Sequence, residues 1–266
     1  MTDTADTIER NALMQLTSKP DAVMVRGRGS YLWDEQGRRY LDFVQGWAVN
    51  ALGHCPDVVQ RALSEPASQL INASPAYHNR PSLEFARELA AASGQSRAFF
   101  CATGAEANEG AIKLARKWGA LHKQGAHEII TLEGSFHGRS LATMAASGKP
   151  GFADRFPPKM PGFVHVAHAD LQAVERALHA GTVAVMLEPI QGEAGVVCLP
   201  PGYLSALRAL TRERGVLLIL DEIQTGMGRT GWKSLRAMVP LTAAIAAMRC
   251  ESSAPNRCDI IPPLLM

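Results

Sequence analysis

The sharpest chemical signal in the sequence is an acid placed directly after an apolar run. Residues 216–220 read Val-Leu-Leu-Ile-Leu and are followed by Asp221, with Gln224 three residues on. A strand that is apolar throughout is typical of a parallel sheet buried on both faces, and ligands of such sheets bind beyond the carboxyl ends of the strands. An ionised Asp221 at that edge can pair with a protonated ring nitrogen of a ligand. A magnesium ligand of a nucleotide-binding protein is excluded, because no G-x-x-x-x-G-K-[ST] motif is present.

A second segment combines glycine with the start of a helix. Residues 103–109 read Thr-Gly-Ala-Glu-Ala-Asn-Glu and precede a helical pattern. Glycine lets a ligand approach the backbone closely, and free amides at a helix start favour a phosphate group. A plain strand-to-helix turn capped by Thr103 is an equally weighted alternative.

A third segment, residues 135–139, follows the apolar run that ends at Leu132. Phe136 can stack on a flat cofactor ring, and Arg139 can form a two-pronged pair with a substrate carboxylate. Taken alone, a solvated loop is the favoured reading of this segment. A fourth segment, residues 188–193, begins with Glu188 after another apolar run. An acid at the end of a buried strand is costly unless it is paired or lies at a site, and pairing with an arginine is the simpler alternative.

These segments alternate with elements that predict an α/β fold with a mainly parallel sheet. We expect strands at 97–101, 127–132, 163–167, 183–188 and 216–221, and helices at 56–70, 81–92, 105–123, 170–179 and 202–214. Short alternating runs between residues 23 and 43, separated by glycines, predict a small antiparallel meander. No G-x-G-x-x-G dinucleotide motif occurs in the strand-to-helix turns.

Composition narrows the class of protein. The chain has 266 residues and a net charge of +2, too small to argue for nucleic acid or a membrane surface as a partner. The five cysteines form no close-spaced pair of the zinc-site kind, so no metal site is expected. An odd number of cysteines without an export signal indicates reduced thiols and a cytoplasmic protein.

In order along the chain, these segments resemble the class III aminotransferases that depend on pyridoxal phosphate (PLP). The matching stretches are residues 31–34 with 40–43, 52–54, 103–109, 136–139, 188–193 and 220–231. Residues 73–75, with Tyr77, Asn79 and Pro81, and residues 136–139 together are most similar to the acetylornithine transaminase branch. The resemblance implies the PLP-dependent transferase fold of type I.

The resemblance also implies a role for individual residues. Gly104 and Ala105 would hold the PLP phosphate, and Phe136 would stack on its ring. Asp221 would pair with the ring nitrogen, and Gln224 would contact the phenolic oxygen. On the substrate side, the family places Arg139 on a substrate carboxylate, with Glu188 and Glu193 shaping that side of the site. The implied reaction moves an amino group from N-acetylornithine to 2-oxoglutarate in a homodimer, as in arginine biosynthesis.

The resemblance has a gap, because the lysine that forms the Schiff base with PLP in this family is missing. Lys233 is the last lysine, only a dozen residues after Asp221. We therefore expect an N-terminal segment of the small domain at 1–50, an incomplete large domain at 51–231 and an atypical tail at 232–266, with the C-terminal small domain absent. We hypothesise that this tail is frameshifted, which the other reading frames of the genomic DNA would test.

Several functions stay open at this point. Transamination would be absent or residual without the lysine. A non-catalytic PLP-binding protein and an unstable fragment are alternatives from other classes, since apolar strands left at a sheet edge invite aggregation. Among enzymes, an ornithine or 4-aminobutyrate transaminase is the alternative.

Overall fold

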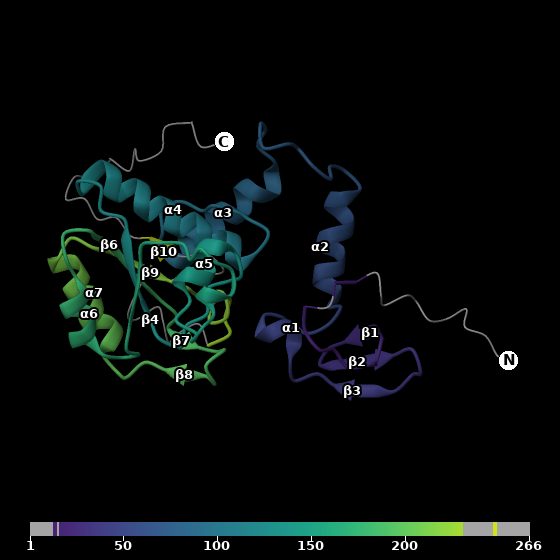
Figure 1. Ribbon diagram of the computed structural model, residues 1–266. Coiled ribbons are helices and arrows are strands. Elements are labelled where there is room, and N and C mark those ends of the chain that lie inside the picture. Colours follow the sequence, from purple (N-terminus) through teal and green to yellow (C-terminus); the bar gives the residue numbers. More distant parts are fainter. Residues whose placement is uncertain (1–12, 15, 231–246, 249–266) are drawn as a thin grey trace. The chain divides into compact units, whose positions relative to one another are not determined.

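The structure is a computed structural model, and it describes residues 13–14, 16–230 and 247–248. The chain forms two compact units (Figure 1). The first comprises Met1–Gly46 and Leu52–Gln69, and the second comprises Trp47–Ala51 and Leu70–Met266. The tail expected at 232–266 lies outside the described residues, apart from Ala247 and Met248.

The first unit contains the expected antiparallel meander. Strands β1 (Met24–Arg28), β2 (Tyr31–Asp34) and β3 (Arg39–Leu41) pair in the order β1-β2-β3. The buried Asp34 side chain closes the turn between β2 and β3 by accepting hydrogen bonds from the amide of Arg38 (2.9 Å) and the hydroxyl of Tyr40 (2.7 Å). Helix α2 (Asp57–Ala67) also belongs to this unit. The meander prediction is confirmed.

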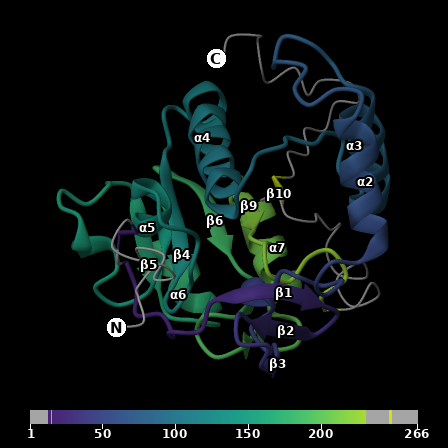
Figure 2. The same cartoon turned by 90° about the vertical axis from the view of Figure 1, so that its right-hand side faces the viewer.

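The second unit is built on a five-stranded sheet in the order β10-β9-β6-β4-β5. Its strands β4 (Glu128–Leu132), β5 (Phe163–Val166), β6 (Thr182–Leu187) and β9 (Leu217–Leu220) run parallel, and β10 (Ala247–Met248) is antiparallel to β9. Figure 2 shows the strands following one another in this order. The prediction of an α/β fold with a mainly parallel sheet is confirmed.

Helices cover both faces of this sheet, which explains why its strands are apolar throughout. Helices α4 (Gly104–His122) and α5 (Leu141–Ala146) pack on one face, where Ile112, Ile129 and Met186 lie in the core. Helices α6 (Leu171–Ala177) and α7 (Tyr203–Glu213) pack on the other, around Leu187 and Leu207. Figure 1 shows α6 beside α7 and α4 beside α5. The remaining elements are α1 (Gln45–Ala48), α3 (Arg80–Ser93), the 3-10 helix Ala153–Arg155, β7 (Ile190–Gln191) and β8 (Val197–Cys198).

One expected strand, at residues 97–101, is wrong. The structure gives this segment no strand pairing, and Phe99 and Phe100 are exposed. A strand exists only where a neighbouring chain takes up its N–H and C=O groups. No other strand in the described part of the chain lies beside this segment. The apolar residues of this segment are typical of a strand, but no strand in the described part of the chain pairs with it.

The order of the strands points to one edge of the sheet. The chain leaves β4 for β5 on one side, and it then returns to β6 and β9 on the other. The sheet therefore changes winding direction between β4 and β6, and ligands of open α/β sheets bind at the carboxyl ends of the strands at such a point. The loops that begin at Glu133 and Glu188 leave β4 and β6 there.

Candidate functional site

The start of α4 forms one side of the candidate site. Thr103 caps the helix: its hydroxyl accepts from the amide of Glu106 (3.1 Å), and the Glu106 carboxylate accepts from the amides of Ala102 and Thr103 (2.8 Å each). The Thr103 cap, which the sequence offered as the alternative to a phosphate site, is present as a reciprocal capping box. The first N–H groups of a helix have no carbonyl partner within it, so the amides of Gly104 and Ala105 can bind an anion, helped by the helix dipole.

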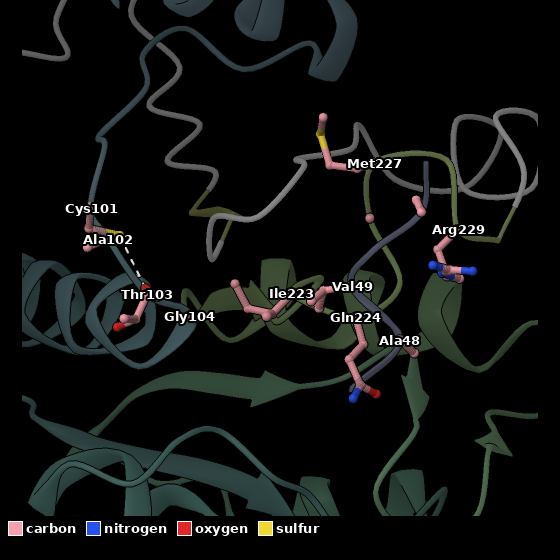
Figure 3. A pocket seen from close by; sticks show the side chains of 12 residues that line it. Ala48, Val49, Cys101, Ala102, Thr103, Gly104, Ile223, Gln224, Met227 and Arg229 are labelled. Carbon is pink, nitrogen blue, oxygen red and sulfur yellow. Dashed lines mark hydrogen bonds between the residues drawn. The ribbon is translucent and has the colours of Figure 1, made fainter. Parts of the chain in front are cut away.

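A cavity of about 240 Å³ opens at this helix start (Figure 3). Gly104 and Gln224 both line it. The cavity wall consists of Ala48, Val49, Ala51, Cys101, Ala102, Thr103, Gly104, Ile223, Gln224, Gly226, Met227 and Arg229. A side chain at position 104 would come within 2.8 Å of Ile223 Cγ2, so glycine lets the helix approach the loop after β9. The Gln224 amide donates to the carbonyl of Trp47 (3.1 Å), which leaves its own oxygen beside Gly192.

Asp221 stands at the end of β9, as the sequence predicted, and is 5% exposed. Its amide donates to the carbonyl of Leu187 and so continues the ladder by one residue (2.9 Å). Its Oδ2 accepts from Asn108 Nδ2 (2.7 Å) and lies 2.8 Å from His137 Nδ1, and its Oδ1 accepts from the amide of Ile223 (3.1 Å). Two donors on one oxygen and one on the other fix the orientation of the carboxylate. Such an arrangement suits an ionised acid that serves as an acceptor.

Asn108 and His137 complete this buried network, and each is 1% exposed. Asn108 Nδ2 also donates to the carbonyl of His137 (2.8 Å), so a single amide ties α4 to the loop after β4 and to Asp221. The two acceptors require that the NH₂ group faces them, and Asn108 Oδ1 is then left without a partner. His137 Nε2 also lacks a partner in the described structure. The ring therefore carries a proton on Nδ1, because this nitrogen can then donate to Asp221.

Sequence reasoning gave neither of these residues a role, although both lie inside the motifs. A usable signal existed for Asn108, because it follows Gly104 by four residues and therefore lies one turn along the same helix face. For His137 the signal was weaker. Its position in a loop does not indicate where its side chain lies, and its partner Asp221 is 84 residues away in the sequence.

Glu188 lies at the end of β6 and is 6% exposed. Its Oε1 accepts from the amide of Phe136 (2.8 Å), so the partner is a backbone N–H and not an arginine. Burial raises the pKa of Glu188 to about 7; the negative charge of Asp221 adds to this effect, and His137 opposes it. A carboxyl group with such a pKa can change its protonation state near neutral pH, as groups in catalytic sites often do.

The Phe136 ring is contacted by a second loop. Phe152 packs against it with ring centroids 5.9 Å apart, and Lys149 Nζ lies 5.9 Å from the ring centroid. The same Nζ is 3.4 Å from Glu193 Oε2. Arg139 is exposed, three residues after Phe136.

The structure brings Glu188 and the backbone of Phe136 into direct contact, and it links most of the other expected residues through intermediate residues rather than in a single cavity. Gly104 and Gln224 line the cavity, Glu188 contacts the backbone of Phe136, and Asp221 reaches the same loop through His137. Ala105 follows Gly104 on the helix. Glu193 contacts Lys149, whereas no described contact links Arg139 to the other expected site residues.

In residues 13–14, 16–230 and 247–248, no group of three His, Cys, Asp or Glu side chains is placed to hold a metal ion. No helix in that part of the chain is long and apolar enough to cross a membrane.

Comparison with known proteins places these features in a family. The model of the family "Aminotransferase class-III" matches residues 14–245. Acetylornithine aminotransferase 2 of Bordetella bronchiseptica is 58% identical over 221 residues, which cover 83% of this chain and 56% of that protein. Acetylornithine aminotransferase of Ralstonia nicotianae is 53% identical over 224 residues and is likewise covered to 56%. This chain therefore spans little more than half the length of the curated relatives that it matches.

Solved structures give the same result for the fold. Ornithine aminotransferase from Toxoplasma gondii superposes with a TM-score of 0.79 at 36% identity, covering 83% of this chain and 53% of that one. N-acetylornithine aminotransferase from Stenotrophomonas maltophilia gives 0.69 at 40% identity, covering 84% and 57%.

Proposed function

Because the chain belongs to the class III aminotransferases, which use pyridoxal phosphate, we propose that it is the cofactor-binding part of an acetylornithine-type enzyme. The proposed reaction moves the terminal amino group of N-acetylornithine to 2-oxoglutarate. The relatives named acetylornithine aminotransferase support this choice of donor. The observation that carries the proposal is the Asp221 carboxylate, which is held by Asn108 and His137 at the end of β9.

The residue types present fit the parts of the cofactor, and among the expected ones Gly104 and Gln224 line the cavity. The cavity of about 240 Å³ has the start of α4 on one wall, where the amides of Gly104 and Ala105 would bind the phosphate. The contact between Gly104 and Ile223, which an added Cβ would block, supports this cradle. Asp221 would face the ring nitrogen, Phe136 would stack on the ring, and Gln224 would reach the phenolic oxygen.

When bound, pyridoxal phosphate supplies an aldehyde that takes up amino groups and a protonated ring that withdraws electrons. The contribution of Asp221 is to hold the proton of the ring nitrogen by charge pairing. Asn108 and His137 prevent rotation of that carboxylate, and Glu188 fixes the backbone of Phe136 so that its ring keeps one position. On the substrate side, Arg139 would bind a carboxylate, with Glu188 and Glu193 near it.

The proposal for this chain is narrower than that for the whole enzyme. The lysine that class III enzymes use to attach the cofactor is not found at the corresponding place among these 266 residues. We therefore assign to this chain cofactor binding with residual transamination or none. We further propose a cytoplasmic homodimer; the free thiols of Cys55, Cys101 and Cys198 support that compartment.

A chimaera tests the proposed donor. Residues 1–230 of this chain would be joined to the remaining part of the Bordetella bronchiseptica relative, and glutamate formation from 2-oxoglutarate would be measured with three amines. The chimaera is expected to prefer N-acetylornithine over ornithine and 4-aminobutyrate, while the 266-residue chain gives only background. Equal or faster turnover of ornithine or 4-aminobutyrate would reject the proposed donor.

A further inference from the structure

One face of the meander in the first unit carries three arginines and two aromatic rings. The strand register places Arg26, Trp33 and Arg39 in one row across β1, β2 and β3, and it places Arg28 beside Tyr31 in the next row. Figure 2 shows these three strands side by side. Residues paired across a sheet lie on the same face, and every second residue of a strand returns to that face. The five side chains therefore share one face, called here the arginine face.

The opposite face of the meander is covered by the first unit itself. Gly27 lies on that face, and an added Cβ there would come within 2.7 Å of the His54 ring. Asp34, the one acid within the three strands, is on the same side by the alternation of the strand, and it accepts hydrogen bonds from Arg38 and Tyr40. The arginine face therefore carries positive charge without an acid beside it, which the net charge of the whole chain does not reveal.

Two of the arginines lie over the aromatic rings. Arg26 Cζ is 4.0 Å from the centroid of the Trp33 ring, Arg39 Cζ is 4.8 Å from that of Tyr31, and the two rings are 6.3 Å apart. All three arginines are exposed, and in the part of the chain that the structure describes no carboxylate pairs with Arg26, Arg28 or Arg39. Their N–H groups are thus available to an external anion, and a guanidinium group matches a phosphate by two parallel hydrogen bonds.

This arrangement matches a ligand that combines phosphates with flat rings. The bases of single-stranded nucleic acids stack on aromatic side chains or on guanidinium planes, while their phosphates bind basic side chains. A run of carboxylates or a layer of phospholipid headgroups supplies the charge but no ring to stack. We propose that the arginine face binds single-stranded nucleic acid without reading its sequence. None of its five residues belongs to the candidate site, so the inference does not depend on the proposed function.

Fluorescence anisotropy of a labelled single-stranded oligonucleotide of about 12 nucleotides, titrated with the full chain, tests the proposal. Each phosphate contact of a single strand contributes about −0.7 to the slope of log K against log salt concentration, so three arginines give about −2. Arg28→Gln should change the slope to about −1.4 and weaken binding about fivefold. Tyr31→Ala should weaken binding at least about fivefold through lost stacking and leave the slope unchanged, whereas Tyr31→Phe should bind as the wild type does.

Arg61→Gln is the matched control, because Arg61 is an exposed arginine on α2 of the same unit and the net charge changes equally. It should alter neither the affinity nor the slope. Equal weakening by Arg28→Gln and Arg61→Gln would show attraction to the net charge alone and overturn the proposal. It would also be overturned by no binding at about 50 mM salt, or by tighter binding of an acidic peptide or of phosphatidylserine vesicles. If Tyr31→Ala did not fold, the comparison of Arg28→Gln with Arg61→Gln would still decide.

Discussion

Replacing Asn108 with alanine removes the amide that holds two parts of the candidate site together. The side chain is 1% exposed, and its Nδ2 donates to Asp221 Oδ2 at 2.7 Å and to the carbonyl of His137 at 2.8 Å. After the change, Asp221 Oδ2 keeps only His137 as a donor, and the His137 carbonyl loses the Asn108 donor. The carboxylate is then held by two donors, His137 and the amide of Ile223, instead of three.

The size of the effect follows from these contacts. A hydrogen bond to a charged group contributes about 1.5–3 kcal/mol, and a neutral one contributes about 1 kcal/mol. The substitution also removes Asn108 Oδ1, a buried acceptor without a partner, which returns about 1 kcal/mol. We therefore expect Asn108→Ala to lower the free energy of unfolding of the second unit by about 2 kcal/mol. A further loss of about 1.4 kcal/mol in the PLP-bound state, where Asp221 would carry the ring nitrogen, would weaken PLP binding about tenfold.

Urea unfolding and PLP titration of the same samples provide the assay. Lys117→Ala, at an exposed position of the same helix, is the matched control, and it should change neither quantity by more than about 0.5 kcal/mol. If Asn108→Ala unfolded at the same urea concentration as the control and bound PLP equally well, the network would not hold Asp221, and the reasoning would be refuted.

Three further predictions concern stability. Burial raises the pKa of Glu188 from 4.5 to about 7, so the folded state favours the protonated acid, and this contribution is present below pH 4.5 and lost as the pH rises through about 7. The free energy of unfolding of the wild type, measured relative to that of Glu188→Gln, should fall by up to about 3 kcal/mol between about pH 5 and about pH 8. Urea unfolding at several pH values measures this difference. If the free energies of the two proteins changed with pH in parallel, the prediction would be contradicted. Gly119→Ala would place a Cβ 1.8 Å from the carbonyl oxygen of Ala126 and should lower the free energy of unfolding by more than about 3 kcal/mol. In the same helix, the Cβ of Gly110→Ala would meet only Phe99, at 3.4 Å. This change should leave the free energy of unfolding unchanged or raise it by up to about 1 kcal/mol. Thermal unfolding compares these two, and equal melting temperatures would refute the packing argument. Thr103→Ala should cost about 1 kcal/mol through loss of the cap, and helix stability unchanged by circular dichroism would oppose that account.

The sequence predicted those parts of the fold that depend on local pattern. The apolar runs at β4, β6 and β9 are strands buried by helices on both sides, and Thr103 caps α4 as its residue type predicts. The strand expected at 97–101 is wrong because pairing does not depend on local pattern alone. Apolar character there was read as a strand, but strand pairing depends on a neighbour that no local pattern reveals.

Local pattern also predicted part of the candidate site. Strand ends locate Asp221 and Glu188 because the sheet geometry fixes where a strand delivers its last residue. The contacts of Asn108, His137 and Lys149 join segments distant in sequence, so residue type and spacing could not reveal them. Glu188 shows the same limit. Its burial predicts a hydrogen-bond partner, and an arginine was one candidate, but the partner in the structure is the backbone amide of Phe136.

A PLP titration of the purified 266-residue chain, followed by absorbance, tests the central claim most directly. The claim is that this chain alone carries the cofactor cradle made by α4, Phe136 and Asp221. It predicts saturable binding of one PLP per chain, weakened more than about tenfold by Asp221→Ala, which removes the charge pair with the ring nitrogen. Absence of saturable binding by a folded chain, or binding that Asp221→Ala leaves unchanged, would contradict it.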